Sequence, residues 1–173
     1  GKVVDRDGNP VSSISVYLYS GDIWVYSSTN GTGLFSMFVS PGSYNLQLYG
    51  GFGLDIASLY KSSPLNLTED TFITMTLQNR YFSGKVVDPE GNPVPNVSIF
   101  IRGSTSFDDF NGYFEKWTTT DSNGNFNITI YTSSSVSLRA TPPPESIYAP
   151  VNIANIDVTD DKTVLIALSY KAG

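Results

Sequence analysis

An eleven-residue phrase occurs twice in this 173-residue chain, and its recurrence limits the fold more than any other feature of the sequence. GKVVDRDGNPV occupies residues 1–11, and GKVVDPEGNPV occupies residues 84–94. Each phrase leads into an alternating apolar segment, ISVYLY from Ile14 and VSIFIR from Val97. A long phrase repeated with the same continuation indicates two copies of one structural unit rather than a single large domain.

Further matches extend the repeat over nearly the whole chain. TNGTGLFSM from Thr29 matches TDSNGNFNI from Thr120, and NLTEDTFITMTL from Asn66 matches the segment that begins at Ile156. The spacing grows from 83 residues at the first phrase to 91 at these later matches, so the second copy carries an insert, which we place near residues 104–117. We therefore predict one domain at residues 1–79 and a second at residues 80–173.

The pattern inside each copy has a period of two residues. Val16 and Leu18, and later Tyr44, Leu46 and Leu48, alternate with polar residues, which is typical of strands with one buried face. Turn sequences such as DGNP, NGTG and SPGS separate these runs. LDIASLY from Leu54 fits either one short helical turn or an edge strand. About seven short strands in each copy predict an all-β chain of two tandem antiparallel β-sandwiches.

The same residues resemble the carboxypeptidase regulatory-like domain, whose pattern is G-x-V-x-D-x-x-G-x-P-V, a strand, and then T-D-x-x-G-x-F. The second copy matches at ten positions: Gly84, Val86, Asp88, Gly91, Pro93, Val94, Thr120, Asp121, Gly124 and Phe126. The first copy departs at Asn30, where the pattern has Asp. The resemblance implies a seven-stranded transthyretin-like or Ig-like sandwich in each copy. It also implies a non-catalytic accessory, spacer or adhesion role in secreted and surface proteins.

Composition excludes several classes of function. The chain has no histidine and no cysteine, so His-based triads, thiolate nucleophiles and their metal sites are excluded, and we predict that it is not an enzyme. The net charge of −6 argues against nucleic-acid binding. No apolar run is long enough for a membrane span, so no membrane insertion is expected. Charged residues make up only 15%, which favours an extracellular or cell-surface location.

Calcium is the one cofactor for which the sequence offers candidate ligands, because this ion prefers clustered oxygen donors. DSNGN places Asp121, Asn123 and Asn125 at alternate positions, and the insert adds Asp108 and Asp109. The alternative interpretation is a plain hairpin turn, since turn Asp residues commonly bond their own backbone. The first copy has no acid at the equivalent NGTG.

Two further sets of residues point to an extracellular surface. Aromatic residues that differ between the copies are candidates for partner contact, either with glycans or with other surface proteins; core or sheet-edge packing is their alternative role. They are Phe107, Phe110, Tyr113 and Trp117 of the insert, with Trp24 and Tyr26 of the first copy. Glycosylation sequons occur at Asn30, Asn66, Asn96 and Asn127.

The two ends of the sequence suggest self-assembly. RYFSG precedes Gly84, whereas nothing precedes Gly1, and SYKAG at residues 169–173 resembles that linker, with Tyr170 and Gly173 in the places of Tyr81 and Gly84. We therefore predict a structural module of a surface filament, stalk or adhesin that assembles head to tail with copies of itself. The alternative is an accessory carbohydrate- or protein-binding module of a secreted enzyme. The expected assembly residues are Gly1, Lys2, Val3, Val4, Ser169, Tyr170, Lys171, Ala172 and Gly173.

Overall fold

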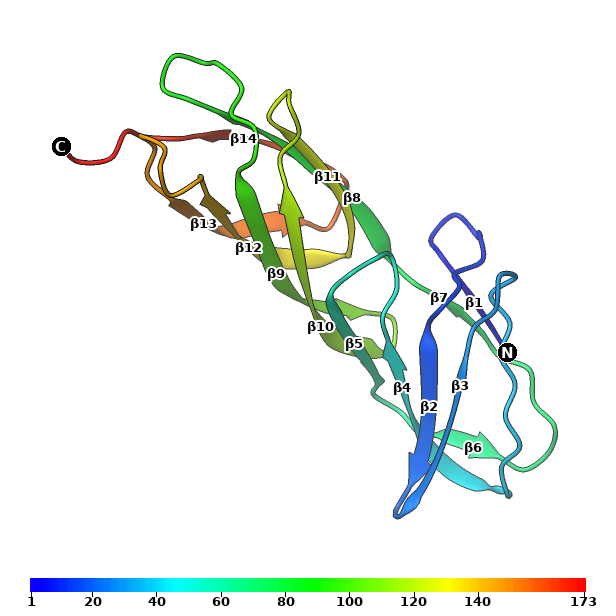
Figure 1. Cartoon of the computed structure of the whole chain (residues 1–173). Coiled ribbons are helices and arrows are strands. Elements are labelled where there is room, and N and C mark those ends of the chain that lie inside the picture. Colours follow the sequence, from blue (N-terminus) through cyan, green and yellow to red (C-terminus); the bar gives the residue numbers. More distant parts are fainter. The chain divides into compact units, whose positions relative to one another are not determined.

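A computed structural model describes all 173 residues and contains fourteen strands and no helix, so no helical segment could cross a membrane (Figure 1). The predicted all-β fold is confirmed. The chain forms two compact units. Unit 1 comprises Gly1–Asn79 and Thr105–Phe114, and unit 2 comprises Arg80–Ser104 and Glu115–Gly173. Residues 1–79, predicted as the first domain, all lie in unit 1, and most of the insert of the second copy lies there as well.

Unit 1 contains the first seven strands. They are β1 (Lys2–Val4), β2 (Ser15–Ser20), β3 (Ile23–Ser28), β4 (Gly42–Tyr49), β5 (Ile56–Lys61), β6 (Leu65–Leu67) and β7 (Thr74–Thr76). β1 pairs with β7 in parallel, and the larger sheet has the order β5-β4-β2-β3, with β6 also pairing with β4. The ambiguous segment LDIASLY forms strand β5, because Ala57 and Leu59 face the core while Ile56 and Tyr60 are exposed.

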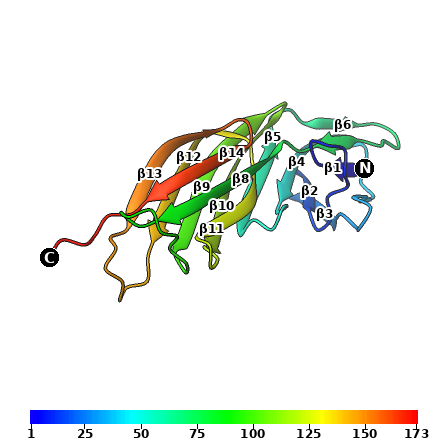
Figure 2. The same ribbon diagram turned by 90° about the horizontal axis from the view of Figure 1, so that it is seen from above.

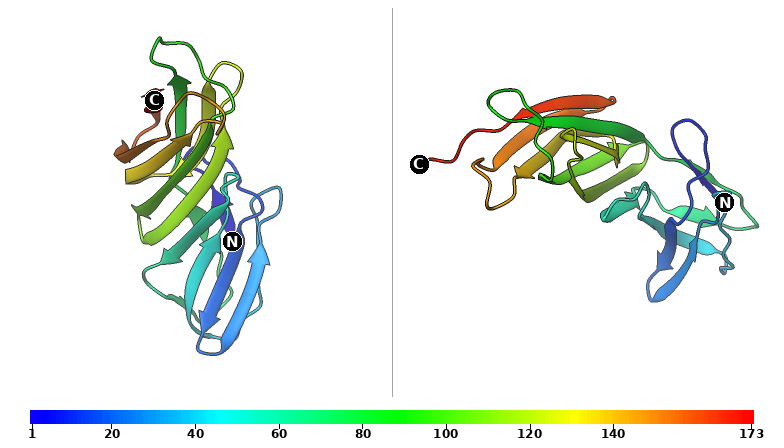
Figure 3. Two further views of the ribbon diagram at one scale, coloured as in Figure 1. Left: turned by 60° about the vertical axis from the view of Figure 1, so that its left-hand side comes forward. Right: turned by 45° about the horizontal axis from the view of Figure 1, so that its top comes forward.

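Unit 2 is built from the last seven strands. They are β8 (Asn79–Val87), β9 (Ser98–Phe107), β10 (Phe110–Thr119), β11 (Asn125–Tyr131), β12 (Ser133–Thr141), β13 (Val151–Val158) and β14 (Lys162–Ala167). One sheet has the order β11-β8-β14, and the other places β13, β12, β9 and β10 side by side. Figures 2 and 3 show β8 and β14 in a layer over β9, β12 and β13. Ile99, Ile101 and Ile130 fill the space between these layers and are fully buried.

The repeated motif joins its first strand to a later turn glycine in the same way in each unit. Val86 N donates to Gly124 O at 2.8 Å, and Val3 N donates to Gly33 O at 2.9 Å. Both glycines have positive φ, 74° and 75°, and a Cβ at either would lie within 2.6 Å of the carbonyl oxygen of that valine. Glycine is therefore required here by conformation and by space together.

The end of the β9–β10 hairpin is an integral part of unit 1. Asp109 O accepts a hydrogen bond from Ser62 N at 2.7 Å, and Asp109 Oδ2 accepts one from Lys61 Nζ at 2.8 Å. Gly112 lies so close to Ser58 O that no side chain would fit. Phe107 and Phe110 are buried with their ring centroids 5.7 Å apart. The hairpin thus supplies unit 1 with both a strand beside β5 and apolar packing.

Candidate strand-accepting groove

The small sheets of the two units can be compared residue by residue. Leu77 N donates to Val4 O at 2.8 Å, and Leu168 N donates to Val87 O at 2.9 Å. β7 therefore corresponds to β14 at a spacing of 91 residues, while β1 corresponds to β8 at a spacing of 83. At a spacing of 91 residues, the counterpart of Tyr170 is Asn79. The resemblance of SYKAG to RYFSG instead aligns Tyr170 with Tyr81, which lies two residues further along the chain.

The small sheet of unit 2 is completed by the first half of β8. Phe82 pairs with Lys162 of β14, is fully buried, and packs its ring edge-to-face on Phe126 at 5.8 Å. Phe126 and Ile128 on β11 are buried in turn. The residues that precede the motif phrase therefore fill the centre of this sheet.

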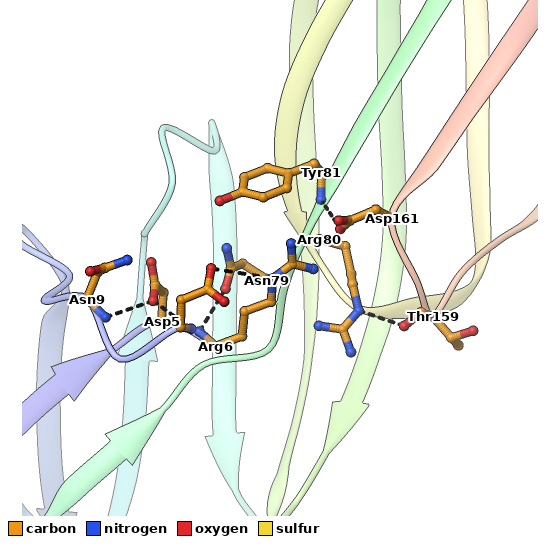
Figure 4. A network of polar contacts seen from close by, with 9 residues as sticks. Asp5, Arg6, Asn9, Asn79, Arg80, Tyr81, Thr159 and Asp161 are labelled. Atoms are coloured by element: carbon orange, nitrogen blue, oxygen red, sulfur yellow. Dashed lines mark hydrogen bonds and ion pairs between the residues drawn. The ribbon is translucent and has the colours of Figure 1, made fainter.

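Two polar contacts hold the start of β8 in unit 2 (Figure 4). Tyr81 N donates to Asp161 Oδ1 at 2.9 Å, and Arg80 Nε donates to Thr159 O at 2.6 Å. Both acceptors lie in the turn that leads into β14. On the unit 1 side of the boundary, Arg6 N donates to Asn79 Oδ1 at 3.0 Å. The strand start is thus fixed through one backbone amide and one basic side chain.

The small sheet of unit 1 stops where β1 begins. Residues 35–40, the counterpart of β11, form no strand, and neither do residues 71–73, whereas β14 already begins at Lys162. Phe35, Met37 and Val39 are half-buried, although their counterparts Phe126, Ile128 and Ile130 are buried. Phe38 is 98% exposed. Both segments therefore contribute less strand structure and less burial to unit 1 than their counterparts contribute to unit 2.

An apolar groove of about 970 Å³ opens at this place in unit 1. Its floor is formed by Leu18 and Leu46 of the large sheet, and its sides include Phe35, Met37 and Phe72. Gly1 lies at one end, where Gly1 O accepts Phe35 N at 3.0 Å and Lys2 N donates to Ile73 O at 2.8 Å. A strand that extends β1 backwards would enter this groove.

The groove also retains the two anchoring positions of unit 2. Thr68 and Asp70 line it, and at the spacing of 91 residues they correspond to Thr159 and Asp161. The repeat aligns these two segments, and the sequence alone indicates no role for them. The signal that could have found them is TED at residues 68–70 against TDD at residues 159–161, read together with the polar contacts of Arg80 and Tyr81.

The predicted assembly residues at the tail are engaged within unit 2. Ser169 O accepts a hydrogen bond from Ala149 N at 2.9 Å, and Lys171 N donates to Ile147 O at 2.8 Å. Lys171 Nζ donates to Pro144 O at 2.7 Å, and the Tyr170 ring stacks on Tyr148 with centroids 5.9 Å apart. Residues 169–171 therefore behave as a closing segment of their own unit, while Ala172 and Gly173 are exposed.

Two of the candidate calcium ligands, Asp121 and Asp109, make contacts within the protein. Asp121 Oδ1 accepts the backbone N–H groups of Asn123 and Asn125, each at 2.9 Å, which is a turn of the plain type. The hydrogen bonds and charge of Lys61 hold the pKa of Asp109 below its usual value, with help from Ser63. Asp108 is adjacent and has a positive φ of 49°. No group of three or more acidic side chains is present, so the geometry lends the calcium prediction no support.

The predicted contact aromatics divide into two kinds. Phe107 and Phe110 are buried in unit 1, which corrects their assignment to partner contact, whereas Tyr113 and Trp117 are exposed. Trp117 stacks on Phe100 of unit 2 with centroids 4.1 Å apart. The four sequon residues, Asn30, Asn66, Asn96 and Asn127, are all exposed. Asn30 Oδ1 also accepts the N–H groups of Thr32 and Leu34, so its side chain holds a turn.

Comparison with known families gives one match, and it covers the second copy. The carboxypeptidase regulatory-like domain matches residues 82–169, just over half of the chain. The chain belongs to this family. The matched residues cover nearly all of β8 to β14 and include every motif residue named for the second copy. A search of curated protein sequences gave no significant match.

Solved structures share the fold at low sequence identity. A minor pilin of Streptococcus agalactiae is 14% identical, with 99% of this chain and 96% of that chain covered and a TM-score of 0.50. The shaft pilin SpaA of Lactobacillus rhamnosus GG is 10% identical over 99% and 96% of the two chains, with a TM-score of 0.47. A 3-chlorocatechol 1,2-dioxygenase of Rhodococcus opacus 1CP is 15% identical over 54% of this chain, which spans 60% of that enzyme, with a TM-score of 0.41. At these identities the likeness concerns the β-sandwich fold alone.

Proposed function

We propose that this chain is a non-enzymatic structural module of an extracellular surface filament, stalk or adhesin, in which repeats join by strand addition at the groove of unit 1. Unit 1 is, in this proposal, a diverged second member of the same family. The observation that carries the proposal is the groove itself, which is apolar, lies beside β1, and retains Thr68 and Asp70. An open sheet edge of this kind is a template for another strand.

The occupant that fits is an extended segment from another repeat with the chemistry of residues 80–82. Its aromatic ring would take the place that Phe82 has in unit 2, over Phe35. Its backbone amide would donate to Asp70, and its basic side chain would donate to the carbonyl of Thr68. Burial of one such ring is worth about 1.5–3 kcal/mol. Because donor and acceptor are different surfaces, the contact repeats without closing and produces a linear assembly.

The tail of this chain is a weaker donor than a segment of that type. Lys171 stands at the Phe82 position when Gly173 is aligned with Gly84, and Gly173 itself stands there in the register of the structure. Neither places an aromatic ring in the groove. Donation by the tail would also break the hydrogen bonds of Ser169 and Lys171 within unit 2.

The experiment is a titration of the full chain with the peptide Asn-Arg-Tyr-Phe-Ser-Gly, which is the sequence of residues 79–84. We expect saturable binding by calorimetry and a higher melting temperature, because the peptide binds only the folded state. Replacing Phe by Ala in the peptide should weaken binding at least tenfold, and D70A in the protein should weaken it less. Absence of binding, or equal binding of the two peptides, would refute the proposal.

A third arm tests the tail directly. The peptide Ser-Tyr-Lys-Ala-Gly, the sequence of residues 169–173, should bind more weakly than the aromatic peptide. Tighter binding by this peptide, together with concentration-dependent polymers that vanish when residues 169–173 are deleted, would make the tail the donor instead.

A second candidate function, an accessory carbohydrate-binding module, is favoured by a different surface of unit 1.

A further inference from the structure

The outer face of the large sheet in unit 1 carries an unusual set of side chains. We call it the outer aromatic face and define it by the outward residues of β2, β3, β4 and β5. The strand register arranges these residues in three rows. One row runs across the sheet as Tyr26, Tyr17, Gln47 and Tyr60. The second is Trp24, Tyr19 and Asn45, and the third pairs Tyr49 with Ser58. An exposed sheet face is normally polar, so six aromatic rings here need an explanation.

The rings are held in fixed positions by one another. Tyr19 and Trp24 stack with centroids 4.5 Å apart, and Tyr17 and Tyr26 stack at 5.6 Å. Tyr49 meets Tyr17 edge-to-face at 5.2 Å. Yet Trp24 remains 57% exposed and Tyr26 71% exposed, because each belongs to the edge strand β3 and presents its far side to solvent. Such cross-strand pairs stabilise the sheet, and they also leave a rigid surface that loses little side-chain entropy when a ligand binds.

Uncharged polar groups lie between the rings. Gln47 is 4% exposed, and its Nε2 donates to Ser58 Oγ at 3.1 Å, so this amide is held in place beneath the rings. Asn45 is exposed beside Tyr19. None of the outward positions of the four strands carries a charge: Ser15, Tyr17, Tyr19, Trp24, Tyr26, Ser28, Ser43, Asn45, Gln47, Tyr49, Ile56, Ser58 and Tyr60. The surface therefore offers π-faces, amides and hydroxyls with no ionic partner.

We propose that the outer aromatic face binds a neutral glycan chain. The C–H faces of a pyranose ring are apolar with positive hydrogen edges, so they pack on the negative faces of Trp24 and Tyr26. The sugar hydroxyls then find partners in the amide of Asn45 and the phenol groups. Acidic polysaccharides and nucleic acids are disfavoured because the face has no Lys or Arg to neutralise them. A protein partner is disfavoured because the outward positions of the face include one aliphatic side chain, Ile56, and no charged side chain.

The corresponding face of unit 2 supplies a matched control. Trp117 is exposed to the same extent, 57%, and stacks on Phe100, but Arg102 and Arg139 lie on the neighbouring outward positions of that sheet. Trp117 thus has equal exposure without the array of rings or the neutral surroundings. If exposed tryptophan alone were sufficient for binding, the two residues would contribute equally.

The test is affinity electrophoresis of the full chain through gels that contain a neutral β-glucan, xylan, galactomannan or dextran, with heparin as the charged polymer. We expect retardation by at least one neutral polymer. W24A and Y26A should each weaken binding at least tenfold, while W117A should leave it unchanged. In a W117F background, the fluorescence of Trp24 should change on titration with the soluble polymer that retards the chain. Urea midpoints of the variants show whether they are folded.

Three outcomes would overturn the proposal. The first is absence of retardation by every neutral polymer, and the second is binding by folded W24A equal to that of the parent. The third is self-association of the chain that W24A abolishes, which would assign the face to a protein interface. Binding of the aromatic peptide to the groove should be unaffected by W24A, so the two proposals can fail separately.

Discussion

The small sheets of the two units begin from the same phrase and differ in how far they extend. β8 has nine residues and β1 has three, although Gly84 and Gly1 stand in equivalent positions against Phe126 and Phe35. The part of each sheet that follows the glycine is the same in both units. The difference teaches that the residues from the glycine onward form the same half of the sheet in both units, whatever the rest of each sheet contains.

The large sheets of the two units differ in their outward residues, and here unit 1 has the more unusual set. Its outward positions are neutral and rich in aromatic rings, whereas in unit 2 Arg139 Nη1 donates to Asn152 Oδ1 at 3.1 Å on an outward row that also carries Arg102. Unit 2 thus has a completed small sheet and charged outward residues on its large sheet, whereas unit 1 holds both candidate binding surfaces.

The largest expected effect comes from truncating the equivalent phenylalanines. F126A should lower the free energy of unfolding of unit 2 by about 3–5 kcal/mol, because a buried ring leaves a cavity. F35A should cost unit 1 only about 1 kcal/mol, since Phe35 borders the open groove and is half-buried. Urea unfolding measures each cost, followed by Trp117 in a W24F background and by Trp24 in a W117F background. Equal costs would mean that the groove is filled in solution.

A smaller effect should come from the two buried threonines of the motif. Thr29 Oγ1 accepts Ile14 N, and Thr120 Oγ1 accepts Val97 N, each at 2.9 Å. T29V and T120V keep the shape but leave a buried N–H without its partner, which costs about 1–3 kcal/mol. Thr120 Oγ1 also donates to Val94 O at 2.9 Å, so the same pair of fluorescence measurements should give the larger loss for T120V, and T119V, at an exposed site, should give none. A larger loss for T29V would contradict this account.

The smallest effect concerns the hairpin end that belongs to unit 1. Because the folded-state pKa of Asp109 is lowered, its contribution to stability is present above the unfolded pKa and is lost as the pH falls through the folded pKa. D109N should therefore destabilise unit 1 at neutral pH, and the difference from the parent should shrink as the pH is lowered from roughly 5 downwards. Urea midpoints of Trp24 fluorescence against pH measure this, with D108N as control. A constant difference across that range would show that Asp109 does not act through its charge.

Much of the fold follows from local patterns in the sequence. Alternation predicts the core faces of β2 and β4, and the turn glycines Gly8 and Gly91 have the positive φ that their phrases demand, 84° and 86°. Ser13 and Asn96 also share a φ of 60° at equivalent sites, which no sequence rule marks for Ser. These features are encoded within about ten residues, so a single sequence is sufficient to find most of them.

The features that sequence reasoning missed depend on contacts distant along the chain. Nothing near Asp109 shows that its partner is Lys61, and the alternation of Phe107 and Phe110 fits burial in either unit. The sequence indicates part of the outer aromatic face: it marks Trp24 and Tyr26 as candidates for partner contact, but not Tyr17, Tyr19 or Tyr49. Only the register of β2 with β3 and β4 brings these rings together.

The assignment of Thr105–Phe114 to unit 1 has a consequence for synthesis on the ribosome. The first 79 residues emerge without the strand that covers β5 and without Phe107 and Phe110. Domains usually fold in the order in which they are made, N-terminal first. Here the N-terminal unit cannot be completed until residue 114 has left the exit tunnel, by which time Arg80–Ser104 of the second unit has also emerged. A polypeptide that ends at residue 79 would expose β5 as a bare edge and should aggregate.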